Sequence, residues 1–162
     1  MKKFIKNYID ICRYSVIAIF LTQSSYAQQD NEDQPYLDQS FLIIASSTNY
    51  DDAQTIALEA QKNLELEYPA SSYYPDKKEG FKTDEICGCG EIHSYFPRGR
   101  YDDGNYVSIE YSSAYEGFTE GYYIVIVSSG QKESVQKELP KVQEKYDQAY
   151  IKNSEIYVGC MH

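Results

Sequence analysis

The sequence predicts an α+β domain in which a four-stranded antiparallel sheet carries two helices on one face. Hydrophobic patterns follow one another in the order strand, helix, strand, strand, helix, strand. A weak internal repeat supports this order, because Ile44-Ala-Ser-Ser47 before one helix matches Ile126-Val-Ser-Ser129 before the other. Two strand–helix halves in a βαββαβ order typically form such a sheet, and its other face is then open to solvent or a ligand.

Residues 1–27 have the three parts of an export signal. A basic segment comes first, an apolar run at 14–21 follows that is too short to cross a bilayer, and Ser25-Tyr26-Ala27 offers a small-x-small cleavage site. A membrane anchor or a buried N-terminal helix is the alternative interpretation. We expect a signal peptide, and hence a periplasmic or extracellular protein.

After the signal, a polar and acidic stretch at 28–39 predicts a flexible leader, and a single domain is expected over 40–160. The apolar run 41–45 predicts its first strand. The first helix is predicted by residues at helical spacing, with Asp51 and Asp52 near its positive N-terminal end. These residues are Ala53, Ile56, Ala57, Ala60 and Leu64.

An inserted loop at 69–105 separates the two halves, and it is rich in Tyr, Gly and Pro without a sustained period. Loops of this length inside a small domain are often functional or disordered. Asp103-Gly104 predicts a tight turn at its end. The strand at 106–111 then alternates, so Val107, Ile109 and Tyr111 share one face while Tyr106, Ser108 and Glu110 share the other.

The last three elements are a strand at 122–127, a helix and a closing strand at 150–158. The first of these strands is apolar throughout, which is typical of a central strand. The helix is predicted by Val135, Leu139, Val142 and Tyr146, and Pro140 should kink it or delay its start.

The composition excludes some classes of partner. Twenty-five acidic and 15 basic residues give a formal charge of −10, and residues 1–27 hold four of the basic and one of the acidic residues, so the rest of the chain carries −13. A surface this negative repels phosphate, so we expect no nucleic-acid partner and no membrane contact after signal cleavage. The 18 tyrosines and the absence of tryptophan are a second bias, and tyrosine can build both a core and a wet recognition surface.

Cys87, Cys89 and Cys160 remain after signal removal, and exported proteins usually use cysteines in disulfides. A bridge within Cys87-Gly-Cys89 would be strained, so we expect a disulfide between Cys160 and either Cys87 or Cys89. His93 and His162 also allow a zinc site, but their spacing matches no standard zinc motif. We therefore expect no metal and no other cofactor.

Six residues are candidate ligand contacts. Tyrosine rings can stack on sugars, and arginines can bind a carboxylate with two hydrogen bonds. The alternatives are that the tyrosines pack as cross-strand pairs and that the arginines pair with Asp102 and Asp103. The six candidates are Tyr106, Ser108, Glu110, Tyr122, Arg98 and Arg100.

The doubled strand–helix unit, the export signal and the closing segment Ala149-Tyr-Ile-Lys-Asn-Ser-Glu-Ile-Tyr-Val-Gly-Cys160 resemble the sporulation-related repeat (SPOR) domains of bacterial envelope proteins, over residues 40–160. The resemblance implies a ferredoxin-like arrangement and binding of peptidoglycan glycan strands. It departs from the family at Ala45-Ser46-Ser47-Thr48, where SPOR domains carry a Gly-Ser-Phe-like turn, and at the inserted loop 69–105.

Two classes of function are consistent with the sequence. One is an exported, non-catalytic module of the cell envelope that binds peptidoglycan or another glycan through the open sheet face. The other is an inhibitor or immunity protein whose acidic surface covers a basic hydrolase, that is, a protein partner in the envelope. An enzyme is not expected, because no phosphate loop, serine elbow or zinc-protease motif occurs in the chain.

Overall fold

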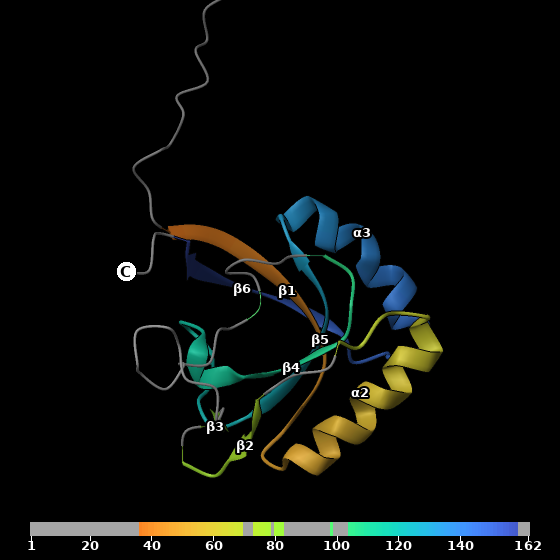
Figure 1. The fold of residues 1–162 in the computed structure, drawn as a ribbon. Helices are drawn as coiled ribbons and strands as arrows, with labels where there is room; N and C mark the ends of the chain where they lie inside the picture. Colours follow the sequence, from red (N-terminus) through yellow and green to blue (C-terminus); the bar gives the residue numbers. More distant parts are fainter. Residues whose placement is uncertain (1–35, 70–72, 79, 83–97, 99–103, 159–162) are drawn as a thin grey trace, which may run out of the picture. The chain divides into compact units, whose positions relative to one another are not determined.

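A computed structural model describes residues 36–69, 73–78, 80–82, 98 and 104–158 of the chain (Figure 1). The predicted signal peptide lies outside these residues. So do Cys87, Cys89 and Cys160, the three cysteines from which the expected disulfide would form. Within the described residues, no helix is both long enough and apolar enough to cross a membrane. The elements are β1 (Tyr36–Ser47), α2 (Tyr50–Leu64), β2 (Tyr74–Asp76), β3 (Gly80–Lys82), β4 (Ser108–Tyr111), a 3-10 turn (Ser112–Ala114), β5 (Tyr123–Gly130), α3 (Lys132–Gln143) and β6 (Tyr150–Tyr157).

The main sheet has the strand order β4-β5-β1-β6, and every neighbouring pair is antiparallel. This confirms the predicted α+β class and the four-stranded antiparallel sheet. β1 begins earlier than expected, because Tyr36–Gln39 pair with Ser154–Tyr157 of β6. The last four residues of the predicted leader therefore belong to the sheet, where pairing with β6 satisfies their backbone groups.

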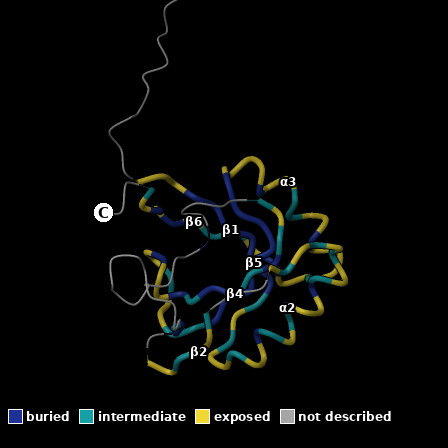
Figure 2. Tube along the Cα trace, in the orientation of Figure 1, coloured by how far each residue is buried: buried dark blue, intermediate teal, exposed yellow. Residues whose placement is uncertain are grey.

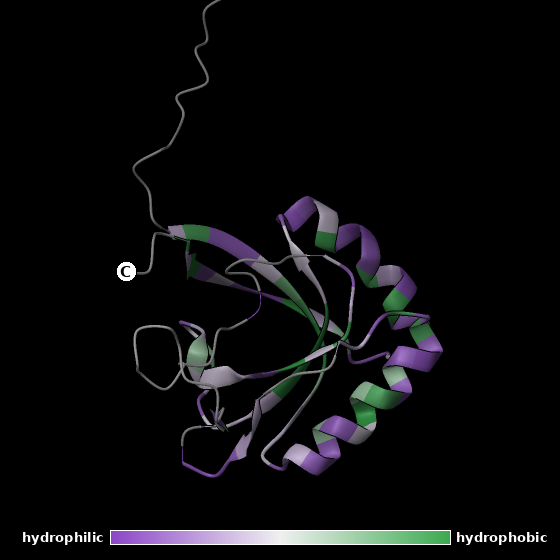
Figure 3. Ribbon diagram, in the orientation of Figure 1, coloured by the Kyte–Doolittle hydropathy of each residue, from purple (hydrophilic) through white to green (hydrophobic). Residues whose placement is uncertain are grey.

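Both helices cover the same face of the sheet (Figure 1). α2 begins at an Asn49 cap, whose side chain accepts the backbone N–H of Asp51 at 3.0 Å, and buries Ala53, Ala57 and Ala60. α3 begins at Lys132, so Pro140 lies inside the helix and does not delay its start. Hydrophilic residues prevail along α3, whereas hydrophobic residues concentrate in the central strands (Figure 3).

The centre of the sheet is buried on both of its faces, and all eight residues of β5 are buried (Figure 2). The helix face carries Leu42, Val125 and Val127 against the buried residues of α2 and α3. The second face carries Phe41, Ile43, Ile124 and Ile126, all nearly inaccessible to solvent. β5 is thus the central strand that its apolar sequence predicted.

Residues 112–122, which connect β4 to β5, cover the centre of the second face, and we call them the covering loop. The Tyr115 ring packs edge-on against the Phe41 ring with centroids 4.8 Å apart. The Phe118 ring also packs edge-on against the Phe41 ring, with centroids 6.3 Å apart. The expectation of a fully open sheet face is corrected here. Four large apolar side chains on that face are more stable when a loop removes them from water.

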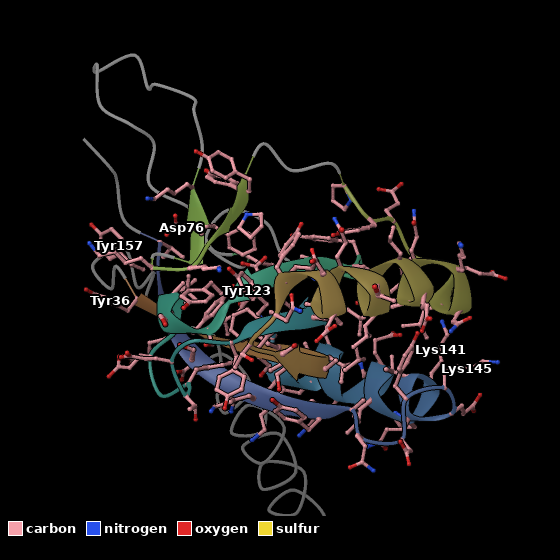
Figure 4. All side chains as sticks on the ribbon, turned by 90° about the horizontal axis from the view of Figure 1, so that it is seen from below. Tyr36, Asp76, Tyr123, Lys141, Lys145 and Tyr157 are labelled. Atoms are coloured by element: carbon pink, nitrogen blue, oxygen red, sulfur yellow. The ribbon has the colours of Figure 1, made fainter. Side chains whose placement is uncertain are left out.

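A short hairpin, β2 paired with β3, forms a second sheet within the inserted loop 69–105. The Tyr123 hydroxyl lies 2.9 Å from the Gly80 carbonyl and 3.3 Å from that of Asp76, so it joins both strands to β5 (Figure 4). Phe81 packs edge-on against Tyr50 and Tyr123 in the main core.

Gly80 makes the hairpin's attachment sensitive to substitution. Its φ is +80°, and a Cβ there would overlap ring carbons of Tyr111. We expect Gly80→Ala to lower the free energy of unfolding by about 2–3 kcal/mol, through left-handed strain plus overpacking, as measured by urea denaturation. Gly117→Ala is the matched control, since Gly117 has φ +75° but no atom within 4 Å of the added Cβ, and should cost only about 1 kcal/mol. Equal losses in the two variants would contradict the steric contact.

Candidate functional site

Arg98 lies on the second face, but it is only 4% exposed. Its Cζ stands 3.6 Å from the centroid of the Tyr106 ring. The guanidinium donates to oxygens of β4, β5 and the turn before β4: the Ser129 Oγ (2.9 Å), the Tyr106 carbonyl (2.7 Å), the Ser108 Oγ (3.2 Å), the Ile126 carbonyl (3.3 Å) and the Gly104 carbonyl. An arginine that donates to so many internal acceptors holds these segments together and does not reach a carboxylate outside the domain.

Glu110 belongs to the same internal cluster. Its Oε2 accepts the backbone N–H of Arg98 at 3.1 Å and lies 3.1 Å from the Tyr115 hydroxyl, which is also 3.2 Å from the Arg98 carbonyl. Burial, and then the Glu110 charge, raise the pKa of Tyr115 well above its ordinary value. The Tyr115 phenol therefore stays protonated and links the covering loop to β4.

The structure thus brings four of the six candidate residues together in one polar cluster, whose members are Tyr106, Ser108, Glu110 and Arg98. Arg98 and Glu110 are buried and satisfied inside the domain, which argues against a role as ligand contacts, whereas Tyr106 and Ser108 are partly exposed and their assignment stays a prediction. Arg100 lies outside the described residues, as do Asp102 and Asp103. Tyr122 is separate from this cluster, because it lies at the opposite end of the β4–β5 ladder, where its carbonyl accepts the Ser112 N–H at 2.8 Å.

Tyr122 lines a hollow of about 260 Å³ that remains where the covering loop ends, and we call it the second-face hollow. The strand residues in its wall share the second face, because Ser46 pairs with Ile124, while Tyr150 and Lys152 pair with Ile43 and Phe41. The lining comprises Ser46, Ser112, Phe118, Thr119, Tyr122, Ile124, Tyr150 and Lys152.

Aromatic rings and hydroxyl groups make up most of this lining. Tyr150 is 45% exposed, and the partial burial of its phenol raises its pKa, so the hydroxyl stays protonated and can donate. The Lys152 ammonium lies 4.4 Å from the centroid of the Phe118 ring. The loop is held in place beneath these groups, since the Tyr122 N–H donates to the Ser112 Oγ at 2.9 Å. An amphipathic ring beside several hydroxyls can stack on a sugar and hydrogen-bond to it.

Two other hollows are lined by groups that maintain the fold. One, of about 550 Å³, lies beside the start of α2, where Tyr50, Tyr111 and Tyr123 pack on one another and the Tyr123 hydroxyl is bonded to the hairpin. The other, of about 440 Å³, lies at the start of α3 beside Ser128, whose hydroxyl donates to Asn105. Among the residues that the structure describes, no group of three His, Cys, Asp or Glu side chains could hold a metal ion.

Of the residues that line the second-face hollow, sequence reasoning singled out Tyr122 as a candidate ligand contact. It did not single out Tyr150, Lys152 or Phe118. The alternation of β6 places Tyr150, Lys152 and Ser154 on one face, and that signal was present in the sequence. Which face they share depends on the register between β6 and β1, which the sequence does not specify.

Comparison of the chain with protein-family models, curated proteins and solved structures finds no match. The resemblance to SPOR domains therefore remains a prediction. The disulfide and the zinc alternative also remain predictions, because Cys87, Cys89, His93, Cys160 and His162 lie outside the described residues.

If Arg98 serves the fold, its removal should cost stability. We expect Arg98→Met to lower the free energy of unfolding by about 2–4 kcal/mol, because buried carbonyls and hydroxyls lose their donor. Urea denaturation would measure the loss, with Lys132→Met on the exposed surface of α3 as the control. An unchanged free energy of unfolding in Arg98→Met would return Arg98 to the candidate ligand contacts.

The raised pKa of Tyr115 predicts a loss of stability in alkali. The unfolded chain releases this proton near pH 10 while the folded protein retains it, so the contribution is complete below pH 10 and is lost as the pH rises toward the folded pKa. Tyr115→Phe should flatten the decline in unfolding free energy above pH 10 by up to about 1.4 kcal/mol per pH unit. Denaturant titrations at a series of pH values would measure it. Phe118→Leu should destabilise the protein without changing that slope, and equal slopes in wild type and Tyr115→Phe would contradict the assignment.

Proposed function

We propose that this protein is an exported, non-catalytic binding module of the bacterial cell envelope, which recognises a glycan of the peptidoglycan type through the second-face hollow. The observation that carries the proposal is the exposed ring of Tyr150 beside Phe118, Tyr122 and several hydroxyl groups. Rings of this kind supply contact area at little entropic cost, and hydroxyls supply orientation.

The envelope setting rests on the export signal and on the SPOR resemblance. The strand order β4-β5-β1-β6, with both helices on one face, is compatible with the ferredoxin-like arrangement of that family. A binding role is favoured over catalysis because, within the part of the chain that the structure describes, no aspartate, glutamate, histidine or cysteine lines the hollow. Those are the groups that most often serve as general acids, bases and nucleophiles in hydrolases.

An inhibitor or immunity protein is the second candidate, and the exposed surface of α2 and of the segment after it favours it. Five acidic residues are exposed there: Asp51, Asp52, Glu59, Glu65 and Glu67. Such a surface would speed association with a basic hydrolase. Sedimentation of the full chain with insoluble cell walls separates the two functions, since a glycan-binding module pellets with the walls, whereas an inhibitor stays in solution and blocks their lysis.

Tyr150 provides the direct test of the hollow. Stacking on its ring should contribute on the order of 1 kcal/mol, so we expect Tyr150→Ala to weaken wall binding about five- to tenfold while the thermal midpoint changes little. Tyr157→Ala is the matched control, because Tyr157 lies on the same strand beside Tyr36 (Figure 4), is 37% exposed and is not among the residues that line the hollow. Equal binding by the two variants would place the glycan site elsewhere.

A further inference from the structure

We infer that the second-face hollow selects a saccharide bearing a carboxylate, and that Lys152 is the residue that determines this specificity. The inference rests on the proposed function and adds the chemical class of the ligand. It starts from the sign of the charge in the hollow, since Lys152 is the one charged residue among the described residues that line it.

The position of Lys152 keeps its ammonium at the hollow. β6 pairs Lys152 with Phe41, so the side chain lies on the second face, and the ammonium stands over the Phe118 ring at 4.4 Å from the centroid. Contact with a ring face uses only part of the ammonium surface, so its other N–H donors can serve a ligand. Among the described residues, no carboxylate forms an ion pair with Lys152.

The other two hollows differ from this one in their charges. The hollow beside α2 contains both Asp51 and Lys77, and the hollow at the start of α3 contains both Lys137 and Glu138. In those two, an acidic and a basic residue offset each other. The second-face hollow alone among the three presents a single positive charge, together with the hydroxyl donors of Ser46, Thr119 and Tyr150.

The negative charge of the whole chain does not prevent an anion from binding here. The formal charge is −10, but at physiological salt the field of charges more than about 8 Å away is largely screened. Within the described lining the charged group is the ammonium of Lys152, and the carboxylates of Glu116 and Glu120 on the covering loop are exposed to solvent and are not part of that lining. A charged hydrogen bond from an ammonium to a carboxylate is about twice as strong as a neutral one, so it can discriminate between otherwise identical sugars.

The experiment compares two forms of one probe. The first is a peptide-free oligosaccharide from peptidoglycan with its lactyl carboxylates free, and the second is the same oligosaccharide with those carboxylates converted to methyl amides. We expect the full wild-type chain to bind the acid form about tenfold more tightly in calorimetric titration, and this preference should decrease at high salt.

Three variants assign the preference to Lys152. In Lys152→Met, which keeps an unbranched side chain of similar length without the charge, both probes should bind with the same affinity, whereas Lys152→Arg should retain the preference. Lys141→Met is the matched control, because Lys141 is exposed on α3 (Figure 4) and is not among the residues that line the hollow. If Lys152→Met fails to fold, the wild-type preference, its salt dependence and the Lys152→Arg variant still decide.

The outcomes separate this inference from the proposed function. Equal binding of the two probes by wild type, with Tyr150→Ala weakening both, would overturn the carboxylate preference and leave the glycan module intact. A preference that survives in Lys152→Met would overturn the role of Lys152. Binding of neither probe would overturn the proposed function itself.

Discussion

The burial of β5 and β1 on both faces is the constraint on which the rest of the structure depends. Leu42, Val125 and Val127 on one face and Phe41 and Ile126 on the other all need protection from water. Two helices supply it on the first face. On the second face the covering loop and Arg98 supply it, and a polar side chain can serve there only because its donors find internal acceptors.

This cover determines which part of the second face stays accessible to solvent. The covering loop is fixed by the Ser112–Tyr122 hydrogen bonds and by Tyr115, which reaches Glu110 and the Arg98 carbonyl. These contacts protect Phe41 and Ile126, but the end of β6 that carries Tyr150 stays exposed. The hollow is therefore what remains of a sheet face that is otherwise filled.

Sequence patterns predicted most of the sheet and both helices, because each of these elements has a periodicity of its own. The short strands β2 and β3 have no such signal, and the polar start of β1 is a strand only because β6 pairs with it. Arg98 was misassigned for a related reason, since burial of a charged side chain depends on acceptors distant in sequence, such as Ser129. The irregular register between Ile43 and Ala45 brings Ser46 to the second face, and local alternation cannot reveal that.

Stability and the proposed ligand binding are consequently assigned to different parts of the same face. Arg98, Glu110 and Tyr115 are hydrogen-bonded to one another, and Arg98 also donates to Tyr106 and Ser129, so changes there act on the fold. Tyr150 and Lys152 belong to β6, an edge strand that has β1 as its one neighbour in the sheet. The side chain of Tyr150 extends beyond the covering loop, where a substitution removes little buried area. An edge strand next to a rigid cover can therefore vary its exposed rings and charges, and with them the ligand proposed for the hollow, without loss of the core.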